Sequence, residues 1–309
     1  GISFADVDAD SASVTATLSV GSGSLAATSG SGVTVSGTAS ALTLTGSVAN
    51  INTFIAASAV SFTTASNATS SVTLTVDIDD GGNTGSGGAK ADSTTVSLLV
   101  TAVNDPPAVT TSAGTQAFIE GAGPVAIDSS LTVTDVDNAT LASATVAITG
   151  NLHAAEDSLA FTNDGSTMGN ISASYNAGTG VLTLTSSGAT ATLAQWQAAL
   201  RSVTYTNNAD TPDTTDRTVS FTVNDGSADS NSVTRTLSVT AVNDAPSITA
   251  PASIAVTEDV AGALTGISFT DVDAGSSSVT VTLSVASGSL AATSGSGVTV
   301  GGTASALTL

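Results

Sequence analysis

The chain has 309 residues, with 25 Asp and Glu against 4 Lys and Arg, and a formal net charge of −21. This acidic balance excludes nucleic acid and anionic membrane surfaces as partners, because phosphate groups are bound by clustered Lys and Arg. Cysteine is absent, which excludes disulfides, zinc–thiolate sites and thiol nucleophiles. Hydrophobic residues make up 41% of the chain but aromatic residues only 3%. Thin β-sandwiches rich in Thr and Val are therefore expected, and the length allows two or three domains.

The first 105 residues alternate small polar and apolar side chains in short runs, as half-buried strands do. Gly and Ser clusters at 21–24 and 81–88 predict turns. Ser47 is predicted to cap a short helix ending at Ile55, with Val48 and Ile51 on its apolar face together with Ile55. Strands are predicted at 13–20, 32–35, 41–45, 60–63, 71–78 and 94–101.

A seven-residue phrase follows the last of these strands and occurs twice, as residues 101–107 and 240–246. In both copies a strand runs into Val-Asn-Asp and a proline then stops it. We therefore predict domain boundaries at the phrase: a type A domain at 1–105, lacking its first strand, and a type B domain at 106–245. Residues 246–309 are the N-terminal part of a second type A domain.

Type B repeats the plan of type A at greater length. Its helix is predicted at Thr192–Leu200, with Thr192 as the cap and Trp196, the single Trp of the chain, covering the open edge of the sandwich. The long segment Asn151–Gly169 is predicted to be a loop. Strands are predicted at 116–119, 130–134, 144–149, 171–175, 181–185, 202–206, 217–223 and 231–239.

Internal repetition supports the division into domains. Residues 266–309 match residues 1–44 without a gap and with six differences, all between small or polar residues, such as Ala5 for Thr270. The chain is thus expected to be a window cut from a longer array. Many short strands with regular turn signals predict an all-β fold of tandem Ig-like antiparallel β-sandwich domains in an extended array, each with a short helical insertion.

Three motifs carry a resemblance to known proteins: the Val-Asn-Asp-x-Pro joints, Asp-Val-Asp after a Glu-containing strand, and Phe-Thr-Val-Asn-Asp-Gly at 221–226. They resemble the cadherin-like tandem repeats of large bacterial surface adhesins of the RTX type, which are frequently exported by type I secretion. The helix at 192–200 with Ser-Val-Thr-Tyr-Thr after it resembles repeats of the chondroitin-sulfate-proteoglycan type. The resemblance covers the whole chain and implies Ca²⁺-stiffened rods at the cell surface.

Acidic residues recur at fixed places, as a metal-binding role would require. In an extended chain, residues i and i+2 share a face at about 6–7 Å, so two carboxylates of Asp-Val-Asp can converge on one cation. Ca²⁺ takes roughly six to eight oxygen ligands, so further acids must contribute. The Asp-Val-Asp pairs are Asp6/Asp8, Asp135/Asp137 and Asp271/Asp273, the acids near the domain starts are Glu120 and Glu258, and the turn acids are Asp79, Asp80, Asp225 and Asp229.

The resemblance implies that these acids gather at the domain boundaries. It implies one set at the A–B boundary, namely Asn104, Asp105, Glu120, Asp135 and Asp137. It implies a second set at the B–A boundary, namely Asn243, Asp244, Glu258, Asp271 and Asp273. The alternative is that Asn, Asp and Gly recur simply because they form turns well.

Enzymatic activity is not expected. His153 is the single His, no Cys can partner it, and no nucleophile elbow is present. No stretch is long enough to cross a bilayer. The predicted function is a structural repeat of an extracellular adhesin, stalk or fibre, whose partners are the neighbouring repeats. Two alternatives stay open: a module that binds surface glycans through 151–169, and a filament subunit completed by strands of identical chains.

Overall fold

The computed structural model describes residues 1–82 and 86–309. Part of the turn predicted at 81–88 therefore lies outside the described residues. The chain divides into two compact units. The first unit comprises 1–108, 134–140 and 224–230, and the second comprises 109–133, 141–223 and 231–309.

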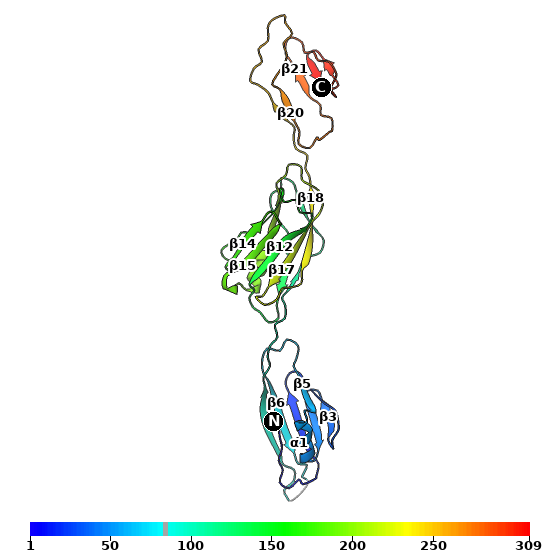
Figure 1. Cartoon of the computed structure of the whole chain (residues 1–309), viewed down its shortest axis with the longest axis vertical. Helices are drawn as coiled ribbons and strands as arrows, with labels where there is room; N and C mark the ends of the chain where they lie inside the picture. The colour runs from blue at the N-terminus through cyan, green and yellow to red at the C-terminus, as the bar shows by residue number, and fades with distance from the viewer. Residues whose placement is uncertain (83–85) are drawn as a thin grey trace. The chain divides into compact units, whose positions relative to one another are not determined.

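The first unit contains an antiparallel sandwich, called here the first sandwich (Figure 1). Its larger sheet has the order β3-β4-β1-β6-β7, and β2 pairs with β5 in the other sheet. Alternate residues of β1 point into the core, so that Val14, Ala16 and Leu18 are buried. The strands are β1 (Val14–Val20), β2 (Ser24–Ala27), β3 (Thr34–Thr38), β4 (Ala41–Gly46), β5 (Val60–Thr63), β6 (Val72–Asp79) and β7 (Ala91–Leu98).

One helix, α1 (Val48–Ala56), packs on this core. Ser47 caps it as predicted, since its side chain accepts a hydrogen bond from the backbone N–H of Asn50. The buried residues are Ile51 and Phe54. The predicted face is therefore rotated slightly, with Phe54 inside and Ile55 only packed against the edge of the core.

The second unit contains a larger sandwich, called here the second sandwich. Its main sheet has the order β14-β15-β12-β17-β18-β9, and β10-β16-β13 face it, while β8 pairs with β11. The strands are β8 (Ala108–Thr110), β9 (Thr115–Ile119), β10 (Val125–Ala126), β11 (Thr132–Thr134), β12 (Ser143–Gly150), β13 (Asp157–Ala160), β14 (Ile171–Asn176), β15 (Val181–Ser186), β16 (Thr204–Asn207), β17 (Arg217–Asn224) and β18 (Val233–Thr240).

The main sheet departs from the antiparallel prediction at one edge, because β9 pairs with β18 in parallel. The register runs from Thr115 opposite Thr236 to Ile119 opposite Thr240. Parallel strands need a long connection, and here most of the sandwich itself forms the connection. β9 and the last strand of the second sandwich, β18, therefore run side by side in the same direction.

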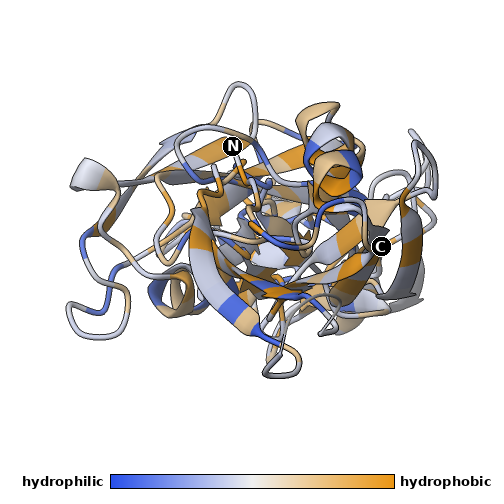
Figure 2. Ribbon diagram, turned by 90° about the horizontal axis from the view of Figure 1, so that it is seen from below, coloured by the Kyte–Doolittle hydropathy of each residue, from blue (hydrophilic) through white to orange (hydrophobic). Residues whose placement is uncertain are grey.

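The core of the second sandwich is built around aromatic side chains. Trp196 lies on α2 (Leu193–Arg201), is fully buried, and donates its indole N–H to the carbonyl of Leu141 at 3.0 Å. Thr192 and Gln195 form a reciprocal capping box at the start of α2, which follows the 3-10 turn Ser187–Ala189. Figure 2, coloured by hydropathy, shows hydrophobic and hydrophilic residues following one another along the strands.

The segment Asn151–Gly169 is not the open loop that was predicted. It contains β13, which pairs antiparallel with β16 from Asp157 opposite Asn207 to Ala160 opposite Thr204. The strand forms because Leu159 fills the core and Asp157 is buried among hydrogen-bond donors.

Residues 247–309 form two small sheets, β19-β20 and β21-β23-β22, and the second of them repeats the pairing of the first sandwich in register. Leu283 pairs with Leu307 as Leu18 pairs with Leu42, in agreement with the sequence repeat. The apolar side of this segment is open: a hollow of about 500 Å³ is lined by residues including Ile248, Phe269 and Leu283. The strands are β19 (Ser247–Thr249), β20 (Ser268–Thr270), β21 (Thr282–Ser284), β22 (Gly301–Thr303) and β23 (Ala306–Thr308).

The all-β prediction is confirmed: the described residues form mostly antiparallel sheets, with α1 and α2 as short helical insertions. Neither of these helices, nor any other in the described ranges, is long and apolar enough to span a bilayer.

Candidate functional site

The first joint is the pair Asn104 and Asp105 with the residues that contact them in the first unit. The backbone N–H of Asp105 donates to Oδ2 of Asp137 at 2.6 Å. Oδ1 of Asp135 accepts from the backbone N–H groups of Asp137 and Asn138, at 2.9 and 2.8 Å. The Asp-Val-Asp motif is therefore a tight turn and not the extended segment that was predicted, and its second carboxylate accepts a hydrogen bond from the backbone of the joint.

Asn104 connects this turn to another one. Its side-chain N–H donates to Oδ2 of Asp225 at 2.8 Å, and its Oδ1 accepts from the side chain of Asn138 at 2.9 Å. Asp225 lies in the turn after β17, where its Oδ1 accepts from the backbone N–H groups of Ser227 and Ala228. The sequence-based site includes Asp225 but misses Asn138, whose signal was its position directly after Asp-Val-Asp.

One oxygen of this cluster lacks a partner. Oδ2 of Asp135 is buried and accepts no hydrogen bond from any described residue. A buried carboxylate oxygen without a donor is costly, so it usually faces a cation, an ion pair or a water. The ion pairs of the described residues lie elsewhere, around Arg217 and Asp213. Within the described ranges, no Lys, Arg or His therefore forms an ion pair with the acids of the first joint.

The pKa of Asp225 is lowered although the side chain is partly buried. Partial burial raises it, but the hydrogen bonds from the backbone of Ala228 and the side chain of Asn104 together outweigh burial. Asp225 is therefore ionised at neutral pH and adds to the negative charge of the first joint.

The second joint, Asn243 and Asp244 with their contacts in the second unit, has the same geometry. The backbone N–H of Asp244 donates to Oδ2 of Asp273 at 2.5 Å, and Oδ1 of Asp271 accepts from Asp273 and Ala274 at 3.1 and 3.0 Å. The Asn243 side chain donates to the carbonyl of Asp244 at 3.0 Å, as Asn104 does to that of Asp105 at 3.3 Å. The motif thus builds the same local structure twice.

The two predicted Glu residues are placed differently. Oε2 of Glu120 accepts from the backbone N–H of Val242 at 2.7 Å, so Glu120 lies beside the second joint rather than among the contacts of Asn104. The parallel pairing of β9 with β18 brings it there, since its own N–H donates to Thr240 at 3.0 Å. Glu258 is exposed, and no hydrogen bond or ion pair to it is found among the described residues.

The remaining predicted acids lie in separate turns. Oδ1 of Asp6 accepts from the backbone of Asp8 at 3.2 Å, and the pKa of Asp8 is raised, chiefly by its hydrogen bond with the Asp6 carboxyl. Asp79 accepts from Gly81 at 2.7 Å. Backbone hydrogen bonds from Lys90 and Gly82 lower the pKa of Asp80.

Asp229 lies in the same turn as Asp225. Its Oδ1 accepts from the side chain of Asn224 at 2.7 Å. The structure therefore gives Asp229 a partner in its own turn.

The donor set of the first joint fits a hard cation. Carboxylate, amide and carbonyl oxygens are the ligands that Ca²⁺ takes, and the side chains that make the contacts of the first joint are Asp and Asn. Within the described parts of the chain, however, no three His, Cys, Asp or Glu side chains converge closely enough to hold a metal by themselves. Asn side chains, backbone carbonyls or water would have to complete the coordination.

A second cluster of charges lies inside the second sandwich. Arg217 is fully buried and its Nε donates to Oδ2 of Asp157 at 2.9 Å. Oδ1 of Asp157 accepts from the hydroxyl of Tyr205 at 2.5 Å and the side chain of Asn207 at 3.1 Å. The pKa of Arg217 is raised, because the hydrogen bond and charge of Asp157 outweigh burial, which alone would lower it.

His153 lies at the rim of this cluster. Its Nε2 is 3.6 Å from Oδ1 of Asp213, and its backbone N–H donates to Asp157 at 2.8 Å. These contacts anchor the segment before β13, and they include no Ser nucleophile.

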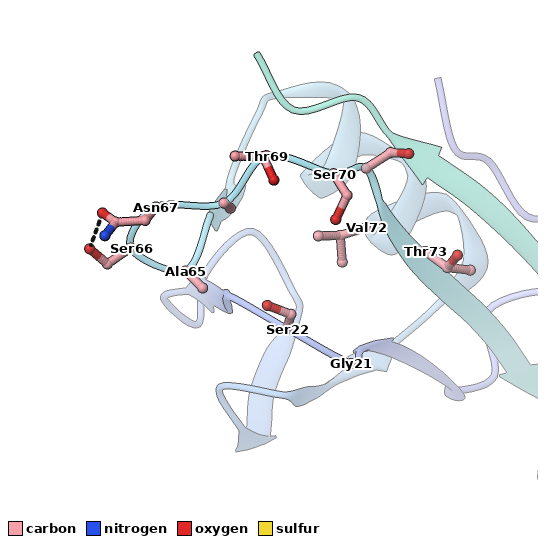
Figure 3. Close-up of a pocket in the computed structure, with 11 residues that line it drawn as sticks. Gly21, Ser22, Ala65, Ser66, Asn67, Thr69, Ser70, Val72 and Thr73 are labelled. Atoms are coloured by element: carbon pink, nitrogen blue, oxygen red, sulfur yellow. Dashed lines mark hydrogen bonds between the residues drawn. The ribbon is translucent and has the colours of Figure 1, made fainter. Parts of the chain in front are cut away.

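A hollow on the surface of the first sandwich is a candidate site for a small ligand. It measures about 540 Å³ and lies between Gly21–Ser22 and the loop 65–73. Figure 3 shows its lining of small side chains, with Ser66 donating to Asn67 at the tip of the loop, at 3.0 Å. The lining residues include no aromatic and no charged side chain, so the hollow lacks the stacking surface that sugar binding usually uses.

No protein-family model matches the chain. Over 150 residues, 48% of this chain, it is 38% identical to halomucin of Haloquadratum walsbyi, of which the matched part is 2%. The chain thus corresponds to a very small part of that relative. Among solved structures it is similar to protocadherin gamma B2 extracellular cadherin domains 1–5, with 15% identity, a TM-score of 0.33, and coverage of 94% of this chain and 45% of that one.

Two further solved structures are similar at the same level. For human CDH23 EC21-23 the identity is 14%, the TM-score 0.35, and the coverage 88% of this chain and 73% of that one. For the C-terminal domain of the Streptococcus pyogenes antigen I/II-family protein AspA the identity is 14%, the TM-score 0.26, and the coverage 76% and 88%.

Proposed function

We propose that the chain is a segment of an extracellular array of β-sandwich repeats, divided at 1–105, 106–245 and 246–309, in which Ca²⁺ binds at the joints. The observation that carries the proposal is the buried Oδ2 of Asp135, which faces no donor in a cluster rich in carboxylates. A bound cation would supply the missing partner and offset the repulsion between the acids.

Three further observations support this function. The same hydrogen-bonded turn occurs at both joints, although the two copies belong to different units. The internal repeat is typical of arrays. The similarity to halomucin, together with the acidic composition, supports a place at the cell surface.

The residues of the first joint would act in two ways. Asp135, Asp137 and Asp225 would supply carboxylate oxygens, while Asn104 would supply an amide oxygen if it exchanged its hydrogen bond with Asn138 for the metal. Pro106 and Pro107 restrict the backbone after Asp105. Holding the Asp105 backbone against Asp137 would then stiffen the connection that follows it.

The second joint would use a related set. Glu120, Asp244, Asp271 and Asp273 would gather there, because β9 delivers Glu120 to the end of β18. This assignment differs from the one that the family resemblance implied, which placed Glu120 at the first joint.

Calorimetric unfolding of the whole chain with Ca²⁺ and with a chelator tests the proposal. A ligand at about 100 times its Kd stabilises the folded state by about 2.7 kcal/mol, so Ca²⁺ should raise the melting temperature measurably. Asp135→Asn keeps the shape but removes the charge, and it should abolish most of this increase. Asp216→Asn, an exposed acid outside the joints, should leave it intact.

Particle length provides a second readout. Small-angle scattering should show a narrower distribution of lengths with Ca²⁺ than with chelator, and Asp135→Asn should widen it again. A melting temperature and a scattering curve that are both indifferent to Ca²⁺ would reject the metal-binding part of the proposal. The repeat architecture would still stand.

A further inference from the structure

Asp is followed directly by Gly at three places in the chain, and each place is a turn. These Asp-Gly turns are at residues 80–81, 164–165 and 225–226. Their Gly residues have φ values of 67°, 72° and 104° in chain order, a region that glycine enters without strain. Oδ1 of each Asp accepts a hydrogen bond from the backbone N–H two residues later. The conformation of each turn therefore depends on both residues.

An Asp-Gly dipeptide is chemically unstable. The backbone nitrogen of Gly can attack Cγ of the Asp side chain, which forms a new N–C bond and releases the carboxyl hydroxyl with the N–H proton as water. Water then opens the cyclic imide at either carbonyl group and gives Asp again or isoaspartate, whose main chain runs through Cγ. Gly permits this attack because it has no side chain to shield the nitrogen. The Gly residues of the three turns are exposed, so water reaches all of them.

The side chain before each Asp makes the same contact in all three turns. Its Oδ1 accepts the backbone N–H of the Gly, at 2.7, 2.8 and 2.7 Å in chain order. The accepting residues are Asp79, Asn163 and Asn224. Asp and Asn differ in charge and in their donors, but they share this acceptor oxygen. The oxygen is therefore the common feature of the three turns.

This contact directs the reactive nitrogen away from its target. When a backbone amide loses its proton, the electron pair that remains lies along the former N–H direction. In the three turns that direction leads to the oxygen of the preceding side chain and not to Cγ of the Asp. We propose that Asp79, Asn163 and Asn224 protect the Asp-Gly bonds that follow them from isomerisation to isoaspartate.

Asp164 has a further protection. Imide formation proceeds through the protonated carboxyl group, because a carboxylate has no hydroxyl to release. The hydroxyl of Thr167 donates to Asp164, and the backbone N–H groups of Ser166 and Thr167 donate as well, so that the pKa of Asp164 lies well below its usual value. The ionised, unreactive form therefore predominates at neutral pH.

The rest of the sequence contains few residues that are open to spontaneous chemical change. Asn-Gly, which forms the same imide faster at neutral pH because its amide is uncharged, does not occur in the 309 residues, although 30 of them are Gly. Cys is absent, and the one Met, Met168, is buried in the core of the second sandwich. The Asp-Gly turns are thus the places where protection matters.

Isomerisation at Asp225 would alter the first joint. Oδ2 of Asp225 accepts from the side chain of Asn104 at 2.8 Å. In isoaspartate, Cγ belongs to the main chain, which becomes longer by a carbon, so this contact would be lost. Asn224 therefore preserves the joint, whether or not a metal binds there.

A comparison of folded and unfolded protein tests the proposal. The whole chain is incubated at neutral pH in buffer or in urea, digested, and analysed by mass spectrometry with electron-transfer fragmentation, which distinguishes isoaspartate from Asp. All three sites should form isoaspartate in urea, and they should form it about tenfold more slowly in buffer, as a hydrogen bond worth about 1.4 kcal/mol implies. Equal rates with and without urea overturn the proposal.

Substitutions of Asn163 separate the acceptor oxygen from the rigidity of the loop. The Asn163 side chain also donates to the carbonyls of Gly169 and Ile171, at 3.0 and 2.8 Å. Asn163→Ala removes the acceptor and these donors, whereas Asn163→Asp removes only the donors and places there the residue type found at position 79. Isoaspartate at Asp164 should form about tenfold faster in Asn163→Ala and at nearly the unsubstituted rate in Asn163→Asp. Equal rates in the two variants, whether fast or slow, overturn the proposal.

The unaltered turns in the same molecules serve as controls. Asp80 and Asp225 should isomerise at unchanged rates in both variants, and the fluorescence of the buried Trp196 verifies that the second sandwich is folded. Asp79→Ala makes the same test in the first sandwich, where Asp80 should be the site that isomerises faster. An acceleration spread equally over all three turns in both Ala variants would show general loosening of the fold, and it would overturn the proposal.

Discussion

The two sandwiches share a plan but stabilise their cores differently. Every buried polar or charged residue of the described chain, including Asp128, Asp157 and Arg217, lies in the second sandwich. The first sandwich buries only apolar residues, with Phe54 as its buried aromatic. The stability of the first sandwich should therefore depend on packing, whereas that of the second should also depend on pH and on intact polar pairs.

The largest effect is expected from Arg217→Met. Removing one partner of a buried pair leaves the Asp157 charge unpaired and costs about 3–5 kcal/mol. The melting temperature of the second sandwich should fall on the order of 10 °C. Trp196 is the single Trp, so its fluorescence follows this sandwich alone, while calorimetry follows both.

The transition of the first sandwich is the internal control for this variant. Its described residues include no buried charged side chain, and it should melt at an unchanged temperature. Asp216→Asn, on the surface of the second sandwich, should shift neither transition. If Arg217→Met moved both transitions equally, the two sandwiches would unfold as one cooperative unit and the comparison would be wrong.

A second prediction concerns pH and Asp128. This carboxylate is buried and accepts from the backbone and hydroxyl of Ser112 and from the backbone of Ser130. Burial raises its pKa, but these hydrogen bonds and the charge of Arg235 lower the pKa by more than burial raises it. The pKa in the folded state therefore lies below the usual value. Its contribution to stability is present above the unfolded pKa of about 3.9 and is lost as pH falls through the folded pKa.

Asp128→Asn should therefore cost about 1–3 kcal/mol at neutral pH and reduce the acid sensitivity of the Trp196 transition. Urea unfolding followed by fluorescence between pH 7 and about pH 3 measures both changes. The exposed Asp92 in the first sandwich offers a matched substitution, Asp92→Asn, which should have little effect. An unchanged pH profile in Asp128→Asn would mean that other acids control the acid unfolding.

The smallest expected effect compares the two helix caps. Ser47 provides a single side-chain cap, whereas Thr192 belongs to a reciprocal capping box with Gln195. Replacing either residue by Ala should cost about 1 kcal/mol, and the cost should be larger for Thr192 because Gln195 loses its partner as well. Midpoints of urea unfolding measure the difference, with Ser22→Ala and Thr211→Ala as exposed controls.

Local features were predictable because their causes lie within a few residues. Ser47 and Thr192 were predicted as helix caps because apolar residues at helical spacing follow each of them, and the structure confirms both caps. The repetition of one geometry at Asp135/Asp137 and Asp271/Asp273 was predicted from the recurring motif, but the extended backbone expected for that motif is wrong, because the first Asp of each pair accepts backbone hydrogen bonds that close a tight turn. The metal-binding roles of these residues remain predictions.

Features that depend on distant pairing were not predictable. Glu120 reaches the second joint only because β9 runs parallel to β18, and nothing near Glu120 in the sequence indicates that direction. The strand β13 was assigned to a loop because its buried Asp157 looks like a solvent-exposed residue until Arg217 and Tyr205 are placed around it. The unpartnered oxygen of Asp135 likewise appears only when the surrounding donors are known.

The parallel pairing of β9 and β18 also decides how the second sandwich carries force. Tension along the polypeptide pulls β9 by its N-terminal end and β18 by its C-terminal end, which are opposite ends of the paired segment. The two strands would have to slide past each other, so the hydrogen bonds from Thr115 opposite Thr236 to Ile119 opposite Thr240 are loaded together and in shear. An antiparallel pair pulled from the same end would open one bond at a time. The second sandwich therefore has its mechanical clamp at the edge where the chain enters and leaves.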